Sequence, residues 1–211
     1  MKRTGVLGGT FDPIHKAHLG IAEAAMREYG LDEVWLMPAG DPYFKADKEV
    51  TPARERLYMT VLSARDEAGK FRVSDLELRL PGDTHTAETM TLLKKRFPKR
   101  AFFFIIGADS LMNLHLWYDI GTLFSCCTVL AAGRPDAAEL GKMKEEIRRL
   151  TGLFPQADIR LIHNALMDVS STEIRHLIES DGEVRAAVTP RVRAYIEARG
   201  LYRKSGNPLD R

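Results

Sequence analysis

Residues 8–19 read GGTFDPIHKAHL, directly after the short apolar run of Val6 and Leu7 and directly before a helical pattern. This order predicts a strand, a glycine-rich turn and a helix. Gly8 and Gly9 let a backbone approach a ligand without interference from a Cβ atom, and the N–H groups at the start of a helix attract anions. The stretch is therefore typical of a phosphate-binding turn.

Two histidines, His15 and His18, follow this turn. A spacing of three places them on one helical face, where two imidazoles can donate hydrogen bonds to oxygens on which charge grows during nucleotidyl transfer. Taken alone, a Gly-Gly turn is a common strand end, and a helical histidine is more often structural than catalytic. Together, in strand, turn and helix order, they favour a nucleotide phosphate site. The dinucleotide fingerprint G-x-G-x-x-G is absent from this turn.

A second candidate motif, DVSSTEIR, occupies residues 168–175. Ser170, followed three residues later by Glu173, forms a capping box, which marks a helix start with free N–H groups in its first turn. On its own this motif is only a good helix cap. Arg175 lies one turn beyond Ser171 and adds a permanent cation on the same side. Placed beside the histidine motif, the segment would complete a two-sided phosphate clamp.

Both motifs resemble those of the nucleotidyltransferase superfamily that carries a GxFDPxHxGH signature. Here the signature reads GTFDPIHKAH, with Ala17 where glycine is usual, and VSSTEIR is similar to the ISSTxIR motif of the superfamily. The resemblance implies catalysis by His15, His18 and Arg175. It also implies ATP contacts from residues of both motifs, namely Gly8, Gly9, Thr10, Phe11, Ser170, Ser171 and Thr172.

Two further segments resemble bacterial nicotinate mononucleotide adenylyltransferases. PAGDPYFK at residues 38–45 is similar to PxGxPPHK, with phenylalanine in place of the histidine, and the match implies that Lys45 approaches the triphosphate as a catalytic residue. FIIGADSL at residues 104–111 resembles FIxGADxL. This match implies ATP binding by Gly107 and Asp109, with the Asp109 carboxylate on ribose hydroxyls.

Three residues are assigned to the mononucleotide. Trp117 matches the tryptophan that stacks on the pyridine ring in this family, whereas a lone tryptophan is otherwise more often core packing. DTHTAET at residues 83–89 occupies the place of the family's SYTxDT segment, with His85 where tyrosine is usual. The resemblance therefore implies mononucleotide binding by His85, Thr86 and Trp117.

The implied reaction converts ATP and nicotinate mononucleotide to deamido-NAD and pyrophosphate. Mg²⁺ is expected on the ATP phosphates, since hard cations bind there with few protein ligands, and no residue is predicted to bind a metal directly. Phosphopantetheine and nicotinamide mononucleotide stay open as alternative acceptors, as does a nucleotide sensor that binds without turnover. The intact His15, His18 and Arg175 argue against the sensor.

The charge of the chain is nearly balanced, with 31 Lys and Arg against 29 Asp and Glu and a formal net charge of +2. This balance argues against a protein whose main task is to coat nucleic acid. The longest apolar run, residues 101–108, is too short to cross a bilayer, so we expect a cytoplasmic protein without a membrane partner. A homo-oligomer is compatible with the sequence.

The two cysteines, Cys126 and Cys127, are adjacent in an apolar run. Strand alternation would point them to opposite faces, so they suit neither a disulfide framework nor a metal cage. We expect them to be small packing residues in a reducing compartment.

Strand-like and amphipathic stretches alternate along the chain, which argues for an α/β fold: a Rossmann-like, doubly wound parallel sheet in a single domain of residues 1–203. The polar tail 204–211 is expected to be loose. Strands are expected at Thr4–Leu7, Glu33–Met37, Phe71–Ser74, Phe102–Ile106, Thr128–Ala131 and Ile159–Ile162. Helices are expected at Leu19–Tyr29, Arg54–Ala64, Ala87–Phe97, Ala137–Leu150, Thr172–Ile178 and Val192–Ala198.

Overall fold

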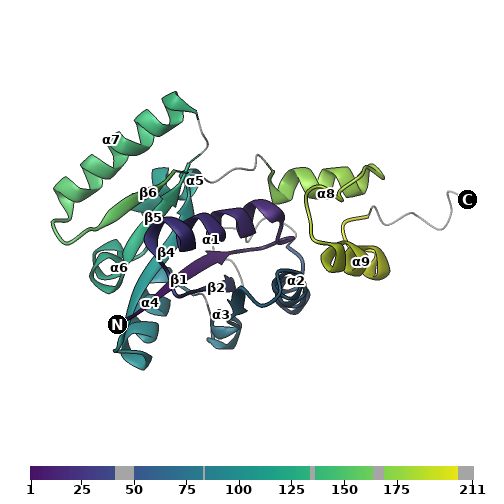
Figure 1. The fold of residues 1–211 in the computed structure, drawn as a ribbon, viewed down its shortest axis with the longest axis horizontal. Coiled ribbons are helices and arrows are strands. Elements are labelled where there is room, and N and C mark those ends of the chain that lie inside the picture. Colours follow the sequence, from purple (N-terminus) through teal and green to yellow (C-terminus); the bar gives the residue numbers. More distant parts are fainter. Residues whose placement is uncertain (41–49, 83, 134–135, 164–168, 204–211) are drawn as a thin grey trace, which may run out of the picture.

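Six parallel strands form one sheet in the order β3-β2-β1-β4-β5-β6 (Figure 1). The structure is a computed structural model and describes residues 1–40, 50–82, 84–133, 136–163 and 169–203. The strands are β1 (Lys2–Gly9), β2 (Glu33–Pro38), β3 (Phe71–Val73), β4 (Arg100–Gly107), β5 (Thr128–Ala132) and β6 (Ile159–Ile162). The predicted doubly wound parallel sheet is confirmed. Its strand order reverses between β1 and β4, where sheets of this kind bind ligands at the carboxyl ends.

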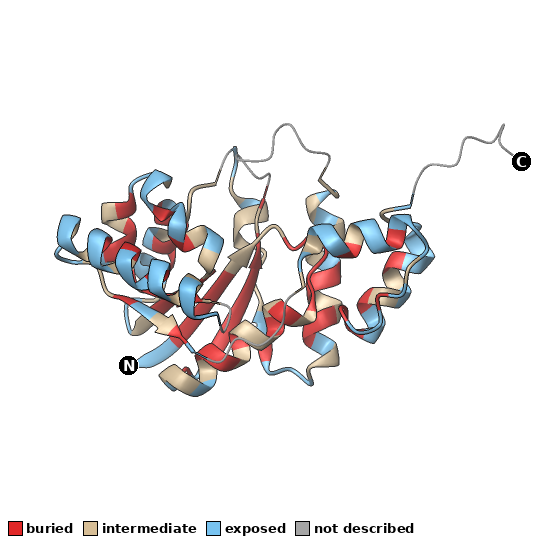
Figure 2. Ribbon diagram, turned by 90° about the horizontal axis from the view of Figure 1, so that it is seen from above, coloured by how far each residue is buried: buried red, intermediate tan, exposed pale blue. Residues whose placement is uncertain are grey.

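The strands are apolar on both sides because helices cover both faces of the sheet. In β4, Phe103 and Ile105 belong to the core on one face, whereas Phe102, Phe104 and Ile106 belong to the core on the other. Side chains alternate along a strand, so burial on both faces requires a continuous apolar sequence. Figure 2 shows the buried strands in the middle of the molecule, flanked by helices whose outer faces are exposed.

The six predicted helices are present and divide between the two faces. Helices α1, α2, α8 and α9 contribute to the first core, and α4 and α7 to the second. Their bounds are α1 (Lys16–Tyr29), α2 (Ala53–Asp66), α4 (Thr86–Arg96), α7 (Ala137–Leu153), α8 (Ser171–Glu179) and α9 (Pro190–Arg199). Helix α9 packs against α2, so the last described residues lie beside a helix from the first half of the chain (Figure 1).

Four short elements were not predicted: α3 (Leu76–Arg79), α5 (Ala108–Met112), the 3₁₀ helix η2 (Leu114–Leu116) and α6 (Ile120–Cys126). The expectation that the cysteine pair lies in a strand is wrong, because Cys126 is the last residue of α6 and Cys127 follows it. The helix forms here since the Asp119 carboxylate accepts the N–H of Thr122 over 3.3 Å and caps its first turn. Both cysteines are free thiols, and Cys127 is buried.

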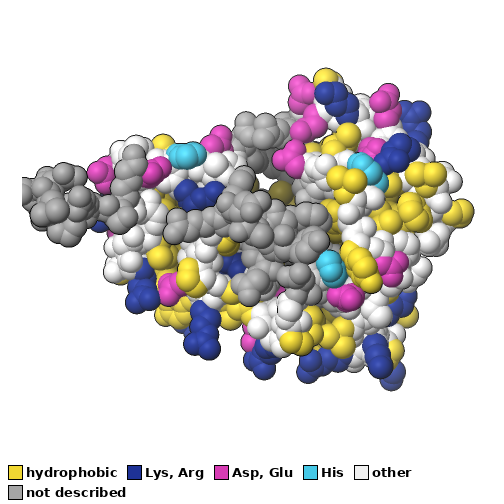
Figure 3. Space-filling view, turned by 180° about the vertical axis from the view of Figure 1, so that it is seen from behind, with side chains coloured by type: hydrophobic (Ala, Val, Ile, Leu, Met, Phe, Trp, Pro, Cys, Tyr) yellow, Lys and Arg dark blue, Asp and Glu magenta, His cyan; other side chains and the backbone are white. Residues whose placement is uncertain are grey.

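The surface carries both signs of charge. On the face shown in Figure 3, basic and acidic side chains are interspersed among polar and apolar ones. In the part of the chain that the structure describes, none of the helices combines the length and apolar character of a membrane span. The predicted Lys45 and the tail 204–211 lie outside the described residues.

Candidate active site

The histidine motif lies directly beyond the carboxyl end of β1. His15 is the residue before α1, and His18 lies in the first turn of that helix. Their rings stack with centroids 3.6 Å apart and planes inclined by 28°. The backbone N–H of His15 donates to Nδ1 of His18 over 3.2 Å. Because Nδ1 of a neutral His18 accepts, its Nε2 carries the proton and is the atom able to donate.

Both imidazoles are neutral at pH 7. Burial lowers the pKa of His15 to about 4, against a smaller upward effect of the Glu173 carboxylate. Burial, and then the neighbouring His15, lower the pKa of His18 well below its usual value. Nδ1 of His15 is buried and has no hydrogen-bond partner within the described ranges. Leaving a buried polar atom unsatisfied costs about 1–3 kcal/mol, and such atoms are therefore candidates for binding another polar group.

The glycines of the turn make room for two aromatic rings. A Cβ atom on Gly9 would lie 2.8 Å from Cε1 of Phe11, and one on Gly8 would lie 3.2 Å from Cζ of Phe104. Phe11 is buried, and its ring meets that of His18 edge-on with centroids 4.9 Å apart. Gly9 is thus needed to seat the ring that packs against His18, a role that the sequence did not reveal. The expected ATP contacts of Gly8, Gly9 and Phe11 remain predictions.

The second motif lies against the first, although 158 positions separate two of the residues that touch. Oγ of Ser171 donates to the carbonyl of Pro13 over 3.0 Å. Arg175 donates from Nη1 to the carbonyl of Asp12 over 2.6 Å and from Nη2 to Oγ1 of Thr172 over 3.2 Å. The structure therefore brings Ser171, Thr172 and Arg175 to the histidine turn, and Arg175 also helps to hold that turn.

Helix α8 begins with the predicted capping box. The Ser170 side chain accepts the N–H of Glu173 over 3.2 Å, and the Glu173 carboxylate accepts the N–H of Ser170 over 2.8 Å. A helix start concentrates N–H groups without intrahelical partners and carries the positive end of the helix dipole. The N–H groups of Ser171 and Thr172 lie in this first turn, and the Glu173 carboxylate of the capping box lies at the same end, near enough to His15 to raise its pKa slightly against the effect of burial.

Arg56 of α2, which the sequence analysis did not single out, connects three segments around the site. It is fully buried. Nη1 donates to the carbonyls of Thr10 over 2.7 Å and Ala39 over 2.8 Å. Nη2 donates to the carbonyl of Gly40 over 2.6 Å, and Nε to that of Thr51 over 2.9 Å. A planar guanidinium with several fixed donors holds the chain beyond β1, beyond β2 and before α2 in one arrangement.

The predicted mononucleotide residues lie beside β4 and the start of α4. His85 precedes α4, and its ring stacks on that of Tyr118 with centroids 4.5 Å apart. Trp117 is half-buried and meets Phe104 edge-on with centroids 6.1 Å apart. Thr86 is the first residue of α4. The contact of His85 with the neighbour of Trp117 brings the three predicted residues into one region.

Two predicted ATP residues follow β4. Gly107 is the residue before α5, and a Cβ atom built on it would meet no atom of the described residues within 4 Å. Asp109 is exposed in the first turn of that helix. These residues lie at the carboxyl end of β4, which is the strand next to β1.

Comparisons with known proteins find relatives along nearly the whole chain. A family model described as cytidylyltransferase-like matches residues 6–177. A relative from Dehalococcoides mccartyi named "Probable nicotinate-nucleotide adenylyltransferase" is 38% identical over 207 residues, which cover 96% of this chain and 98% of the relative. A relative of the same name from Neisseria meningitidis is 38% identical over 205 residues, 97% of this chain and 100% of its own length. The chain belongs to the nicotinate-nucleotide adenylyltransferase family.

Solved structures related to this family share the fold. Plasmodium falciparum nicotinic acid mononucleotide adenylyltransferase complexed with NaAD has a TM-score of 0.75 at 22% identity, covering 96% of this chain and 98% of that chain. The same enzyme complexed with APC has a TM-score of 0.71 at 20% identity, with the same coverage. The agreement extends over nearly the whole of both chains, so this chain has the same fold as that enzyme.

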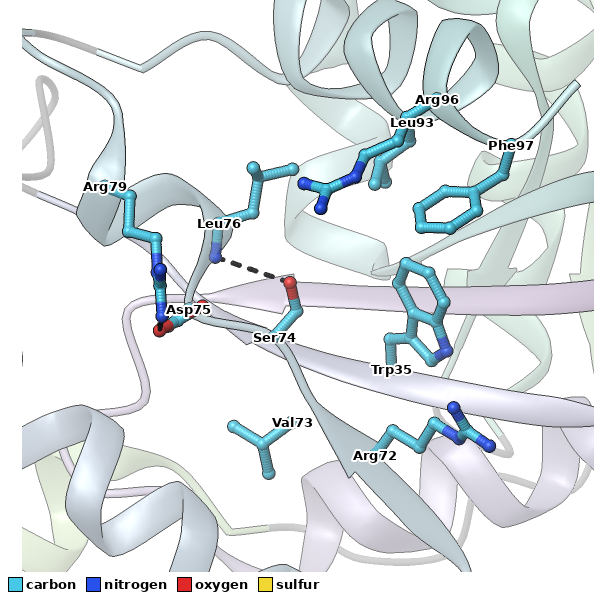
Figure 4. A pocket seen from close by; sticks show the side chains of 10 residues that line it. All are labelled: Trp35, Arg72, Val73, Ser74, Asp75, Leu76, Arg79, Leu93, Arg96 and Phe97. Atoms are coloured by element: carbon cyan, nitrogen blue, oxygen red, sulfur yellow. Dashed lines mark hydrogen bonds and ion pairs between the residues drawn. The ribbon is translucent and has the colours of Figure 1, made fainter.

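A cavity of about 370 Å³ is lined by none of the residues of the histidine motif. Figure 4 shows it between β2, β3, α3 and the end of α4. Its lining residues are Trp35, Arg72, Val73, Ser74, Asp75, Leu76, Arg79, Leu93, Arg96 and Phe97. No predicted site residue is among them. Within the described ranges, no group of three or more His, Cys, Asp or Glu side chains is placed to hold a metal ion.

Proposed function

We propose that this chain transfers the adenylyl group of ATP to nicotinate mononucleotide, giving deamido-NAD and pyrophosphate. The observation that carries the proposal is the stacked pair of His15 and His18, buried and neutral at the carboxyl end of β1. Arg175 lies against the same turn. The acceptor is inferred from the names of the relatives, which cover nearly the same length.

In the proposed reaction, a phosphate oxygen of the mononucleotide attacks the α-phosphorus of ATP in line. The bond from that phosphorus to the pyrophosphate oxygen breaks, and the leaving pyrophosphate takes the negative charge. His15 and His18 donate hydrogen bonds to the oxygens that gain charge, and Arg175 and Lys45 add positive charge. Phosphoryl transfer asks for little covalent work, so position and electrostatic stabilisation suffice and no side-chain nucleophile is needed.

The proposed ATP residues divide between the two strand ends. The turn after β1, with Gly8, Gly9, Thr10 and Phe11, and the start of α8, with Ser170, Ser171 and Thr172, would bind the phosphates. Gly107 and Asp109 after β4 would bind the nucleoside, with the exposed Asp109 carboxylate on ribose hydroxyls. ATP enters as its magnesium complex, because Mg²⁺ takes most of its ligands from phosphate and water. On the grounds of the cysteines and the short apolar runs, the proposed compartment is the cytoplasm.

The proposed acceptor preference comes from the start of α4. Thr86 and the residues after it begin a helix, whose first N–H groups lack intrahelical acceptors. Such donors suit the carboxylate of a nicotinate ring stacked on Trp117. A carboxamide would turn its NH₂ group toward at least one donor and leave polar groups unpaired, at about 1–3 kcal/mol each. Since each 1.4 kcal/mol is a factor of about ten, we expect kcat/KM to favour the nicotinate form by roughly tenfold to a hundredfold.

The test is product identification with pyrophosphate release. The protein is incubated with ATP and Mg²⁺ and, in parallel, with nicotinate mononucleotide, nicotinamide mononucleotide or phosphopantetheine. We expect deamido-NAD as the preferred product. Equal efficiency with the amide would remove the proposed acceptor preference while leaving adenylyl transfer intact. ATP binding without pyrophosphate release for any acceptor would support the sensor and contradict the proposal.

A further inference from the structure

The last described turn of the chain reaches back to the histidine turn. Helix α9 ends at Arg199, and Gly200 follows with a left-handed φ of 62°. The N–H of Leu201 donates to the carbonyl of Ile196 over 3.1 Å and closes this turn. Tyr202 then points its hydroxyl at the carboxylate of Asp12, where it donates to Oδ1 over 2.6 Å. The contact joins two residues 190 positions apart.

Asp12 is the point at which four segments meet. Oδ1 accepts from Tyr202, and Oδ2 accepts the backbone N–H of Thr51 over 3.2 Å. The carbonyl of Asp12 accepts Nη1 of Arg175 over 2.6 Å. Asp12 itself is 4% exposed, so its carboxylate has little access to water and depends on these donors. The contacts tie the end of the chain, the segment before α2 and helix α8 to the turn that leads into His15.

Tyr202 adopts an unusual backbone conformation to make this contact. Its φ is 65°, in the left-handed region that residues other than glycine seldom occupy. Such a conformation persists only where the surrounding structure stabilises it. Burial, and then the Asp12 carboxylate, raise the pKa of the Tyr202 phenol, so the hydroxyl keeps its proton and remains a donor.

We propose that Tyr202 is a positioning residue for adenylyl transfer, which sets the histidine turn and Arg175 by holding the Asp12 carboxylate. Tyr202 does not touch the reacting atoms. It acts through Asp12, whose carbonyl receives the Arg175 guanidinium and which lies three positions before His15. The inference rests on the proposed function, because the activity it modulates is adenylyl transfer.

The test uses Tyr202→Phe in the full chain, with Tyr29→Phe as the matched control. Tyr29 is also half-buried, and its hydroxyl donates to the carbonyl of Leu161 over 2.5 Å, tying α1 to β6. Both variants lose one hydroxyl and its long-range hydrogen bond, and Tyr202→Phe also loses the weak contact of that hydroxyl with Sδ of Met59 at 4.0 Å. We expect kcat/KM for ATP to fall about tenfold in Tyr202→Phe, the factor for the loss of roughly 1.4 kcal/mol, and to stay within twofold in Tyr29→Phe. KM for nicotinate mononucleotide should be unchanged in both.

A double-mutant cycle with Arg175→Lys separates positioning from general destabilisation. If Tyr202 acts through Asp12, Tyr202→Phe and Arg175→Lys disturb two contacts of the same residue, one at its carboxylate and one at its carbonyl, and their combined loss in kcat/KM should be clearly smaller than the product of the single losses. For Tyr29→Phe combined with Arg175→Lys, the loss in kcat/KM should equal the product of the two single losses. All rates are measured well below the unfolding midpoint of each variant.

Three results would overturn the inference while wild-type turnover stands: unchanged kinetics in Tyr202→Phe, an equal loss in Tyr29→Phe, or losses that multiply in the Tyr202 cycle. A Tyr202→Phe protein that is unfolded even at low temperature would also overturn it, in favour of a purely structural role. Absence of turnover in the wild-type protein with every acceptor would instead contradict the proposed function.

Discussion

The two ends of β1 and its neighbouring strands hold buried ionisable groups in opposite ways. At the amino end, the Glu33 carboxylate is bound by Lys2 at 2.8 Å, by Arg72 at 3.1 Å and by Arg100. Nε1 of Trp35 also donates to it over 3.0 Å. Burial alone would raise the pKa of Glu33, but the hydrogen bonds from Lys2 and Arg100 and the charges of Arg100 and Arg72 lower it to about 2.

At the carboxyl end the polar groups are less completely paired. His15 and His18 are held neutral by burial, and Nδ1 of His15 has no partner among the residues described. A carboxylate surrounded by cations is satisfied within the protein and has little left to offer a ligand. A buried ring nitrogen without a partner, such as Nδ1 of His15, has that capacity. Under the proposed function, the amino end stabilises the fold, whereas the carboxyl end binds and stabilises charge that a substrate brings.

The largest effect should follow from removing an imidazole at the carboxyl end. We expect His18→Ala to lower kcat by roughly 10²–10³, the scale for losing one donor to transition-state charge, and His15→Ala to do at least as much. Because the two rings pack on each other and on Phe11, the melting temperature should also fall, so turnover is compared well below the unfolding midpoint of each variant. Steady-state kinetics and thermal unfolding of the same preparations check both halves of this expectation. Near-normal turnover in either variant would remove that histidine from the mechanism.

At the amino end we expect a substitution to lower stability and to leave turnover nearly unchanged. In Glu33→Gln an NH₂ group would face donors such as Lys2 or Arg72 in place of a carboxylate oxygen. Hydrogen bonds to charged groups contribute about 1.5–3 kcal/mol each, so unfolding should become easier by an amount of this order. Turnover at 25 °C should stay within twofold of wild type. Denaturant unfolding and kinetics test this, and a large drop in kcat of the folded variant would break the division between the two ends.

A smaller effect is the pH dependence of the free energy of unfolding. Each proton bound by only one of the folded and unfolded states changes this free energy by no more than about 1.4 kcal/mol per pH unit. A histidine in the unfolded chain is protonated below its pKa of about 6.5, whereas the pKa of His15 in the folded protein is about 4. The free energy of unfolding should therefore fall as pH drops through this window. Glu33 keeps its charge to about pH 2 in the fold, so its contribution is lost only below the unfolded pKa near 4.

Urea unfolding at pH 7, 5 and 3.5 separates these two contributions. His15→Gln should show a shallower loss of stability between pH 7 and 5 than the wild type. Glu33→Gln should follow the wild type between pH 7 and 5 and differ from it in slope between pH 5 and 3.5, where the unfolded Glu33 carboxyl takes up a proton. If the free energy of unfolding has the same dependence on pH in the wild type and in His15→Gln, the pKa of His15 is not lowered in the folded protein.

The sheet was predictable because both of its faces are covered. A strand such as β4, with apolar residues from Phe102 to Ile106, can be read from the sequence alone. The short helices were not predictable, since a helix such as α6 has only seven residues and depends on a single cap at Asp119. The cysteine pair was misplaced for that reason.

The two phosphate motifs could be found from the sequence, whereas the residues that hold them in place could not. Asp12 stands inside the first motif but was given no role from the sequence, and Tyr202 is a single polar residue without a periodic signal. Arg56 has a periodic signal, because it precedes Met59 and Ser63 at the spacing of the buried face of α2. A cation in a core-facing position indicates a buried polar partner. The acceptors of Arg56 are carbonyls from three separate segments, which only the folded chain brings together.

The two tryptophans of the chain provide the most direct test, because one lies at each end. Trp35 donates to Glu33 at the amino end, and Trp117 lies in the proposed mononucleotide region after β4. Their indole N–H signals in a ¹⁵N–¹H spectrum can be assigned with Trp35→Phe and Trp117→Phe. On titration with nicotinate mononucleotide we predict a saturable shift of the Trp117 signal and an unchanged Trp35 signal. A shift of Trp35 with Trp117 unmoved would contradict the assignment of binding to the carboxyl end of the sheet.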